Sequence, residues 1–362
     1  MKIDSEDRKK VTLSCRNVWK VYGSTPDKFF IKKNGAVTDA TAHADQIRDG
    51  GHIVANADVS FDVHAGEIFV IMGLSGSGKS TIVRCLSRLV EPTAGEIILD
   101  GESLLNKTAD ELINIRRHKM GMVFQSFGLM PHLNVIDNIA FPLKLQGKSE
   151  GERYAQAQRV IDLVGLQGRE NNFPKELSGG EQQRVGIARS LAVEPDIWFL
   201  DEPFSALDPL IRKQMQDEFL RIQSLLHKSI VFITHDFHEA LRLADRMAIM
   251  RDGAIVQIGR PVDLILKPVD DYIREFTLDV PWESILTAAD IVEPQAKPLE
   301  KLHKVGSDTL VEDLLRYLGD NDRGVAVEST DGTLLGVATA QGVVRALASS
   351  TRSERLVEKA SE

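Results

Sequence analysis

The sequence is poor in several features, and each absence excludes a class of protein. Only two cysteines, Cys15 and Cys85, occur in 362 residues, which excludes a disulfide framework and a cysteine-based zinc site. No apolar run approaches the roughly 18 residues of a membrane span, and the first ten residues are too charged for a signal peptide. The formal net charge of −9 provides no basic excess for nucleic acid. We therefore expect no nucleic-acid partner, and a protein that is cytosolic or held at a membrane by another subunit.

The composition indicates a globular chain with more than one domain. Hydrophobic residues make up 43% and charged residues 27%, and 362 residues suit one large domain with a smaller one. Residues 11–22 predict a strand, and 23–51 predict an inserted loop with one short helix. Further along, buried strand patterns alternate with helical ones, which predicts a parallel sheet wrapped by helices. The strand patterns are VSFDV (59–63), EIFVIMG (67–73), IWFL (197–200), SIVFIT (229–234) and RMAIM (246–250). Residues 104–170 are mainly helical in pattern, so we expect a helix-rich insertion.

A glycine-rich loop follows the second of these strands. GLSGSGKST (73–81) matches G-x-x-x-x-G-K-[ST] between a buried strand and a helix, and this context argues against a chance match. Its glycines allow consecutive backbone N–H groups to surround phosphates. We expect Lys79 to reach the β- and γ-phosphates of ATP and the Ser80 hydroxyl to ligate Mg²⁺. The predicted nucleotide contacts are Gly73, Ser75, Gly76, Ser77, Gly78, Lys79, Ser80 and Thr81.

Polar residues stand at the ends of three other predicted strands. Asp201 and Glu202 follow IWFL, where Asp201 could hold Mg²⁺ through water and Glu202 could polarise an attacking water. His235 ends SIVFITH and could donate to the γ-phosphate; Gln125 ends MGMVFQ and could touch Mg²⁺ or the water. Taken alone, the acidic pair is better explained as a helix cap and His235 as a structural hydrogen-bonding residue, and Gln125 is equally ambiguous. Together with the loop they predict the catalytic set Lys79, Gln125, Glu202 and His235 and the metal set Ser80, Gln125 and Asp201.

A second anion cradle lies about a hundred residues later. In LSGGEQQRV (177–185) a small polar turn runs into a helical pattern, so that backbone N–H groups face an anion. Because this motif belongs to the helical insertion, we do not expect it to reach the nucleotide of its own chain. In a head-to-tail, two-fold pair each insertion would cover the ATP of the other copy. The sequence thus predicts a homodimer, with nucleotide contacts from Ser178, Gly179, Gly180 and Glu181.

Residues 11–260 resemble the nucleotide-binding subunit of an ABC transporter. The family's elements occur in its order: Walker A (73–81), the Q-loop at Gln125, the signature (177–182), Walker B with its glutamate (197–202), the SALD loop (205–208) and the switch His235. The resemblance implies an α/β P-loop NTPase fold with a parallel-sheet core, an antiparallel β subdomain and a helical subdomain at about 126–190. It also implies that Tyr22 stacks on adenine and that Asp208 couples the two sites of the dimer. Tyr22 could equally be an ordinary strand aromatic, because residues 23–51 separate it from Walker A.

Three segments narrow the resemblance to bacterial ATPases that power uptake of quaternary amines and related solutes such as glycine betaine, choline or proline. They are 67–81, 123–143 and 204–218. This resemblance implies an ATPase at the cytoplasmic face of the inner membrane, with integral permease subunits and, indirectly, an extracytoplasmic solute-binding protein. The apolar segment 127–142 would form the groove for a permease coupling helix, although core packing explains it as well. The alternatives are an importer ATPase for an amino acid such as histidine, a soluble ABC ATPase without a permease, and a nucleotide-sensing regulator with a vestigial ATPase.

The composition changes near the end of the ATPase pattern. We predict an ABC ATPase domain over 11–276, a linker over 277–299, a single α+β unit resembling a CBS motif over 300–350 and a disordered tail over 351–362. Relatives often carry two CBS units in tandem. TAQG (339–342) puts Gly342 where the motif would have a ribose-contacting acid, which argues against adenosine-nucleotide sensing. A passive folded cap is the other interpretation of this unit.

Overall fold

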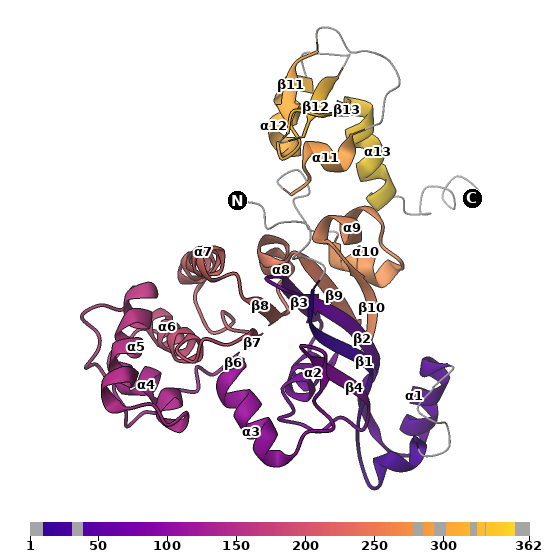
Figure 1. Cartoon of the computed structure of the whole chain (residues 1–362). Helices are drawn as coiled ribbons and strands as arrows, with labels where there is room; N and C mark the ends of the chain where they lie inside the picture. Colours follow the sequence, from indigo (N-terminus) through magenta and orange to yellow (C-terminus); the bar gives the residue numbers. More distant parts are fainter. Residues whose placement is uncertain are drawn as a thin grey trace. The chain divides into compact units, whose positions relative to one another are not determined.

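The structure, a computed structural model, describes residues 10–30, 39–277, 285–292, 302–318, 324–329 and 331–351. The chain divides into two compact units, Met1–Val256 and Gln257–Glu362. Figure 1 shows the elements of each unit. Every helix within the described ranges is too short or too polar to span a lipid bilayer.

A mainly parallel sheet has the order β10-β9-β3-β8-β7-β6, and all of its residues except 257–259 of β10 belong to the first unit. Its strands are β3 (Ile68–Gly73), β6 (Met120–Val123), β7 (Ile197–Asp201), β8 (Ser229–Thr234), β9 (Arg246–Arg251) and β10 (Ala254–Gly259). The strands β3, β7 and β8 are buried along their whole length, as expected for strands covered on both faces. Parallel pairing of β6, β7, β8, β3 and β9 brings their carboxyl ends to one edge, where the predicted catalytic residues follow.

A second, antiparallel sheet has the order β2-β1-β4-β5. It consists of β1 (Val11–Tyr22), β2 (Ile53–His64), β4 (Ala94–Leu99) and β5 (Glu102–Ser103). The segment between β1 and β2 contains a 3-10 turn (Pro26–Phe29) and α1 (Ala40–Asp49), which confirms the predicted short helix. Ala44 and Ile47 of α1 pack with Trp19 and Val21 in a small separate core.

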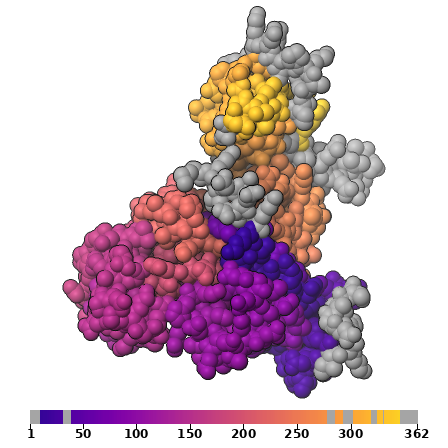
Figure 2. Space-filling model, viewed as in Figure 1, coloured from indigo at the N-terminus to yellow at the C-terminus, as the bar shows by residue number. Residues whose placement is uncertain are grey.

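The remaining helices of this unit include the predicted helical insertion. They are α2 (Lys79–Leu86), α3 (Ala109–His118), α4 (Val135–Leu145), α5 (Glu150–Leu163), α6 (Gly179–Leu191), α7 (Pro209–Leu226) and α8 (Phe237–Leu243), with a 3-10 turn at Pro174–Glu176. In Figure 2 the magenta segment with α4 to α6 forms a lobe of the first unit. Asn134, Ser149 and Ser178 cap α4, α5 and α6 through their side chains, so the sequence defines where each helix begins.

The second unit contains a three-stranded sheet with the order β11-β12-β13. Its elements are α9 (Pro261–Leu266), α10 (Asp271–Thr277), α11 (Ala288–Ile291), β11 (Lys304–Gly306), α12 (Val311–Leu318), β12 (Val325–Glu328), β13 (Leu334–Ala338) and α13 (Ala340–Thr351). Residues 300–350 were expected to form an α+β unit, and their described part contains the helices α12 and α13 and the strands β11, β12 and β13. The compact unit begins before the predicted boundary at 276, because Val262 and Leu266 of α9 pack against its core. The CBS-like identity stays a prediction, and most of the linker and residues 352–362 lie outside the described residues.

Candidate functional site

The glycine-rich loop joins β3 to α2, as predicted, and two of its glycines are required by close backbone contacts. Gly73 has φ +153°, and a Cβ there would lie 2.3 Å from the Met250 carbonyl oxygen. Gly78 has φ +95°, and its Cβ would lie 2.2 Å from the Ala55 carbonyl oxygen. Backbone atoms cannot move aside cheaply, so only glycine fits either position. Around Gly76, by contrast, a Cβ would meet nothing within 4 Å.

The loop presents polar groups that suit phosphate oxygens. Gly78 caps α2 without a side-chain hydrogen bond, so the first N–H groups of the helix are available to an anion. Lys79 Nζ donates to the carbonyls of Gly73 (2.8 Å) and Leu74 (3.0 Å). Burial lowers the pKa of Lys79, while the charges of Glu202 and Asp201 oppose that shift. The buried Ser77 Oγ has no hydrogen-bond partner in the described part of the chain, so the loop fits the phosphates of ATP. Ser75 is exposed, and Thr81 is half-buried on α2.

Two oxygen ligands of the predicted metal set are hydrogen-bonded to each other. Ser80 Oγ donates to Asp201 Oδ1 at 2.9 Å, which links the start of α2 to the end of β7. Burial raises the pKa of the Asp201 carboxyl, and the bond from Ser80 partly counteracts it. A hydroxyl beside a desolvated carboxylate is a donor set of the kind that Mg²⁺ prefers, so these residues fit the ion.

The four predicted catalytic residues are positioned by three strands and a loop, and two of them, Gln125 and His235, contact one carboxylate oxygen of a third, Glu202. Glu202 Oε2 lies 3.3 Å from Gln125 Nε2 and 3.0 Å from His235 Nδ1. Glu202 has φ +47°, a conformation uncommon outside glycine, and its N–H donates to the Ile233 carbonyl at 3.1 Å. The His235 side chain is 59% exposed and that of Glu202 only 16%. The carboxylate is therefore held in place while the imidazole can meet a ligand from solvent.

The second cradle begins α6, and the chain's own residues cap it. Ser178 Oγ donates to Glu181 Oε2 at 2.8 Å, and the Ser178 N–H donates to the same oxygen at 2.8 Å. The Glu181 N–H in turn donates to Ser178 Oγ at 3.3 Å, which completes a capping box. These bonds lower the pKa of Glu181, and Arg169 pairs with its carboxylate at 2.9 Å. Ser178 and Gly179 are exposed and Gly180 is half-buried, so this cradle faces outward.

The two remaining predicted residues stand at element ends. Asp208 caps α7, accepting from the Ile211 N–H at 3.1 Å. Tyr22 ends β1, opposite Ile53 of β2, and is 42% exposed, with Lys20 Nζ 4.7 Å from the centre of its ring. Their roles in dimer coupling and adenine stacking stay predictions.

Two residues that support the site were not found from the sequence. Asn56 of β2 donates through Nδ2 to the Gly78 carbonyl at 3.1 Å and so holds the phosphate loop. Arg189 of α6 donates to the Phe127 carbonyl at 3.2 Å and to the Gly128 carbonyl, just after Gln125. Both Phe127 and Gly128 have positive φ. Neither Asn56 nor Arg189 belongs to a motif, and only the folded chain brings them to these carbonyls.

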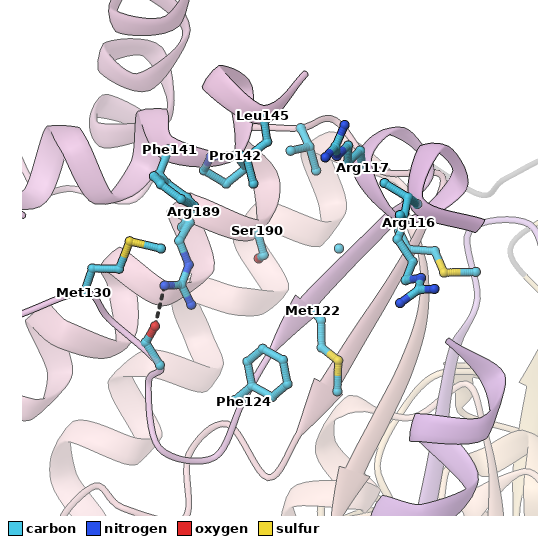
Figure 3. A pocket seen from close by; sticks show the side chains of 15 residues that line it. Arg116, Arg117, Met122, Phe124, Met130, Phe141, Pro142, Leu145, Arg189 and Ser190 are labelled. Atoms are coloured by element: carbon cyan, nitrogen blue, oxygen red, sulfur yellow. Dashed lines mark hydrogen bonds between the residues drawn. The ribbon is translucent and has the colours of Figure 1, made fainter. Parts of the chain in front are cut away.

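A groove of about 460 Å³ lies beside the Gln125 loop. Figure 3 shows its apolar side chains, among them Met122, Phe124, Phe141, Pro142 and Leu145, with Arg116, Arg117 and Arg189 among the residues that line it. It therefore combines apolar surface with positive charge. Gly128, Met130, Phe141 and Pro142 of the segment 127–142 line it, while Val135 and Ile139 of the same segment are buried in the core.

Known proteins resemble this chain over most of its length. The sequence profile of the family described as ABC transporter matches residues 57–205. The trimethylamine N-oxide transport system ATP-binding protein TmoW of Pelagibacter ubique is 52% identical over 325 residues, which are 90% of this chain and 94% of TmoW. The glycine betaine transport ATP-binding protein OpuAA of Bacillus subtilis is 46% identical over 289 residues, 80% of this chain and 68% of OpuAA.

A solved structure agrees with these relatives. The dimeric post-hydrolysis structure of the ATP-binding cassette MJ0796, bound to ADP and Pi, is 31% identical, with a TM-score of 0.57 over 69% of this chain and 98% of that chain. The predicted P-loop NTPase fold, the ATPase activity and the family are thus confirmed. The chain belongs to the ATP-binding subunits of ABC transporters and is an ATPase of that family.

Proposed function

We propose that this chain hydrolyses ATP for a binding-protein-dependent importer of a quaternary amine or a related methylated solute. The observation that carries the catalytic assignment is the convergence of Gln125 and His235 on one oxygen of Glu202. A carboxylate held in this way beside a phosphate loop can orient a water for in-line attack on a γ-phosphate.

Each residue of the site has a role that follows from its position. Glu202 accepts the proton of the water, His235 donates to a γ-phosphate oxygen, and Lys79 neutralises charge on the phosphates. Ser80 and Asp201, with the Gln125 amide, are the residues that would hold Mg²⁺. The ion, when bound, neutralises phosphate charge. Tyr22 is proposed to stack on adenine because it ends a strand with its ring partly exposed.

The working unit is proposed to be a homodimer with two composite sites. Ser178, Gly179, Gly180 and Glu181 form an outward-facing anion cradle, and in a two-fold pair they would close over the ATP of the second copy. The dimeric state of the ADP-bound cassette MJ0796 supports this arrangement. Asp208, at the start of α7, would lie at the same interface.

The groove beside the Gln125 loop is proposed as the docking site of an integral permease subunit. Its apolar floor suits one face of a short amphipathic helix, and its arginines favour acidic side chains on that helix. Gln125 contacts the catalytic Glu202, so its position would change when ATP is hydrolysed. Because the groove lies beside the Gln125 loop, that change could reach the permease subunit. The subunit would therefore be peripheral, at the cytoplasmic face of the inner membrane. The solute-binding protein would act only through the permease.

The solute class is inferred from the relatives. TmoW is named for trimethylamine N-oxide and OpuAA for glycine betaine, two solutes that share a trimethylated nitrogen. The match spans 94% of TmoW but only 68% of OpuAA, so this chain covers more of the length of TmoW than of OpuAA. Aromatic side chains of the binding protein, outside this chain, would select a methylated cation.

Solute-stimulated ATPase of the reconstituted transporter tests this proposal. The chain is purified with its permease and binding protein and assayed with trimethylamine N-oxide, glycine betaine, choline, proline and histidine. We expect stimulation by the methylated amines and none by histidine. Stimulation by histidine alone would support the amino-acid alternative. Failure of any integral membrane subunit to co-purify would support the soluble ABC ATPase.

A further inference from the structure

One arginine near the site has no part in the proposed chemistry and yet connects two of its segments. Arg212 lies in the first turn of α7, directly after the SALD loop. Its Nη2 donates to the Leu207 carbonyl at 3.1 Å, and its Nη1 lies 3.4 Å from Asp236 Oδ2. A single side chain therefore joins the end of the SALD loop to the residue that follows His235.

The Asp236 end of this link leads to the catalytic carboxylate. Asp236 Oδ1 accepts from the Glu239 N–H at 3.2 Å and so caps α8, while its N–H donates to Thr234 Oγ1 at 2.9 Å. One carboxylate oxygen thus holds the start of α8 and the other binds Arg212. The neighbouring His235 reaches Glu202 at 3.0 Å. Arg212 also lines a small pocket together with Glu202, His235 and the buried Glu239, so two acidic groups besides Asp236 share this pocket with it.

The other end of the link leads to the signature motif of the same chain. A Cβ on Gly180 would lie 2.8 Å from Ile211 Cγ2, and one on Gly179 would lie 3.6 Å from Leu207 Cδ2. The segment 207–211 therefore packs against the glycines of the second cradle. It stands between the cradle, which would serve the ATP of the second copy, and the His235 segment, which serves the ATP of its own chain.

We propose that Arg212 is a positioning residue that transmits the state of one ATP site to the signature motif serving the other. It would act through Asp236 and the Leu207 carbonyl, without touching nucleotide or water. This inference rests on the proposed roles of Glu202 and His235 and on the two-chain site. The Arg212 and Asp236 side chains are 31% and 30% exposed, and such a partly hydrated pair adds little to folding stability. Loss of the pair should therefore lower kcat while changing the free energy of unfolding little.

A double-mutant cycle in ATP turnover tests the coupling. Arg212→Met removes both bonds, and Asp236→Asn removes the charge but keeps an amide oxygen that can cap α8. We expect each single variant of the full-length dimer to have a kcat about 5-fold lower, which is the low end of the range for coupling between two sites. The KM for ATP should be unchanged, and the Hill coefficient of ATP hydrolysis should move closer to one. The double variant should be no slower than either single one. Arg212→Lys, which keeps the charge, should recover part of kcat.

Arg242 supplies a matched control. It also joins α8 to α7, through Gln216 Oε1 (3.2 Å) and Asp217, but it touches neither the SALD loop nor the His235 segment. Arg242→Met should therefore keep the kcat of the unaltered chain. The inference is overturned if Arg212→Met has a normal kcat, or if Arg242→Met lowers kcat as much as Arg212→Met does. It is also overturned if the fold-loss of kcat in the Arg212→Met, Asp236→Asn double variant equals the product of the fold-losses in the two single variants. A Glu202→Gln variant that still turns over would instead overturn the catalytic assignment, so the two failures are distinguishable.

Discussion

The two anion cradles of this chain are built from the same local material, yet they differ in how complete they are. Each is a Ser/Gly-rich turn at the start of a helix, at Gly78 for α2 and at Ser178 for α6. The first has no side-chain cap, and the buried Lys79 and Ser77 lie beside its helix start. The second is exposed and capped by Ser178 and Glu181.

This difference indicates what each cradle needs from its ligand. In the first, burial, close backbone contacts and the hydrogen bonds of Lys79 fix the geometry before any nucleotide arrives, which is the preorganisation expected of a binding loop. In the second, a carboxylate of the same chain uses the hydroxyl and N–H that an incoming phosphate would use. A phosphate that binds at the second cradle must compete with Glu181 for these donors. The second cradle therefore suits a reversible contact with the nucleotide.

The largest expected effect concerns the carboxylate beside the first cradle. Glu202→Gln should lower kcat about 1,000-fold, since a positioned general base contributes on the order of 10²–10⁴. ATP binding should persist, and ATP-bound dimer should accumulate on gel filtration. Glu218→Gln in α7, where the carboxylate pairs with Arg221, is the control and should turn over normally. Wild-type turnover in Glu202→Gln would remove Glu202 from its role.

The second cradle can be broken without touching the first. Ser178→Arg should lower hydrolysis about 100-fold, because an interfacial donor to the γ-phosphate is lost and a bulky cation enters the interface. Affinity of the monomer for a fluorescent ATP analogue should stay close to that of the unaltered chain.

Ser149 provides the matched control for that variant. It caps α5 in the same kind of box, with Ser149 Oγ donating to Glu152 Oε2 at 2.6 Å. Ser149→Arg should lose a similar helix cap, but its rate of ATP hydrolysis should be unchanged. If Ser178→Arg instead abolishes nucleotide binding to the monomer, Ser178 touches the nucleotide of its own chain and the two-chain arrangement is wrong.

A pair of alanine substitutions separates the rigid cradle from the adaptable one. Gly78→Ala would place a Cβ 2.2 Å from a backbone oxygen at φ +95°, whereas Gly180→Ala would place one 2.8 Å from the Cγ2 methyl of the Ile211 side chain. We expect Gly78→Ala to cost about 2 kcal/mol in the free energy of unfolding. Gly180→Ala should cost less, about 1 kcal/mol, because the Ile211 side chain rather than the backbone has to shift. Thermal unfolding of both variants measures the difference, and equal losses would contradict this contrast.

The smallest expected effect concerns the competing carboxylate. Glu181→Gln keeps the capping box but removes a negative charge from the place where a γ-phosphate would enter. The KM for ATP should fall about 2-fold, which corresponds to about 0.4 kcal/mol and lies within the range for a charge at a helix start. Glu152→Gln in the α5 box is the control and should leave KM unchanged. A higher KM in Glu181→Gln would show that Glu181 assists the nucleotide.

Much of the fold could be predicted because its signals are local. The strands at 11–22 and 229–234 were predicted at their observed bounds, since residues 11–22 alternate between apolar and polar side chains and residues 229–234 are largely apolar. The catalytic set was found because its members follow buried strands, and parallel strands bring their carboxyl ends together. The strand β10 and the helices α9 and α10 were missed. The half-buried strand and the two short helices carry only a weak periodic signal.

By itself the sequence determined the phosphate loop, the strand ends that carry Asp201, Glu202 and His235, and the capping box of α6, because these depend on residue type at fixed short spacing. Only the tertiary structure decided that Asn56 and Arg189 support the site, that Arg212 joins the SALD loop to Asp236, and that α9 packs with the second unit. Those contacts join surfaces that meet only once the sheets and helices have packed, and long polar side chains carry no periodic pattern that marks their partners.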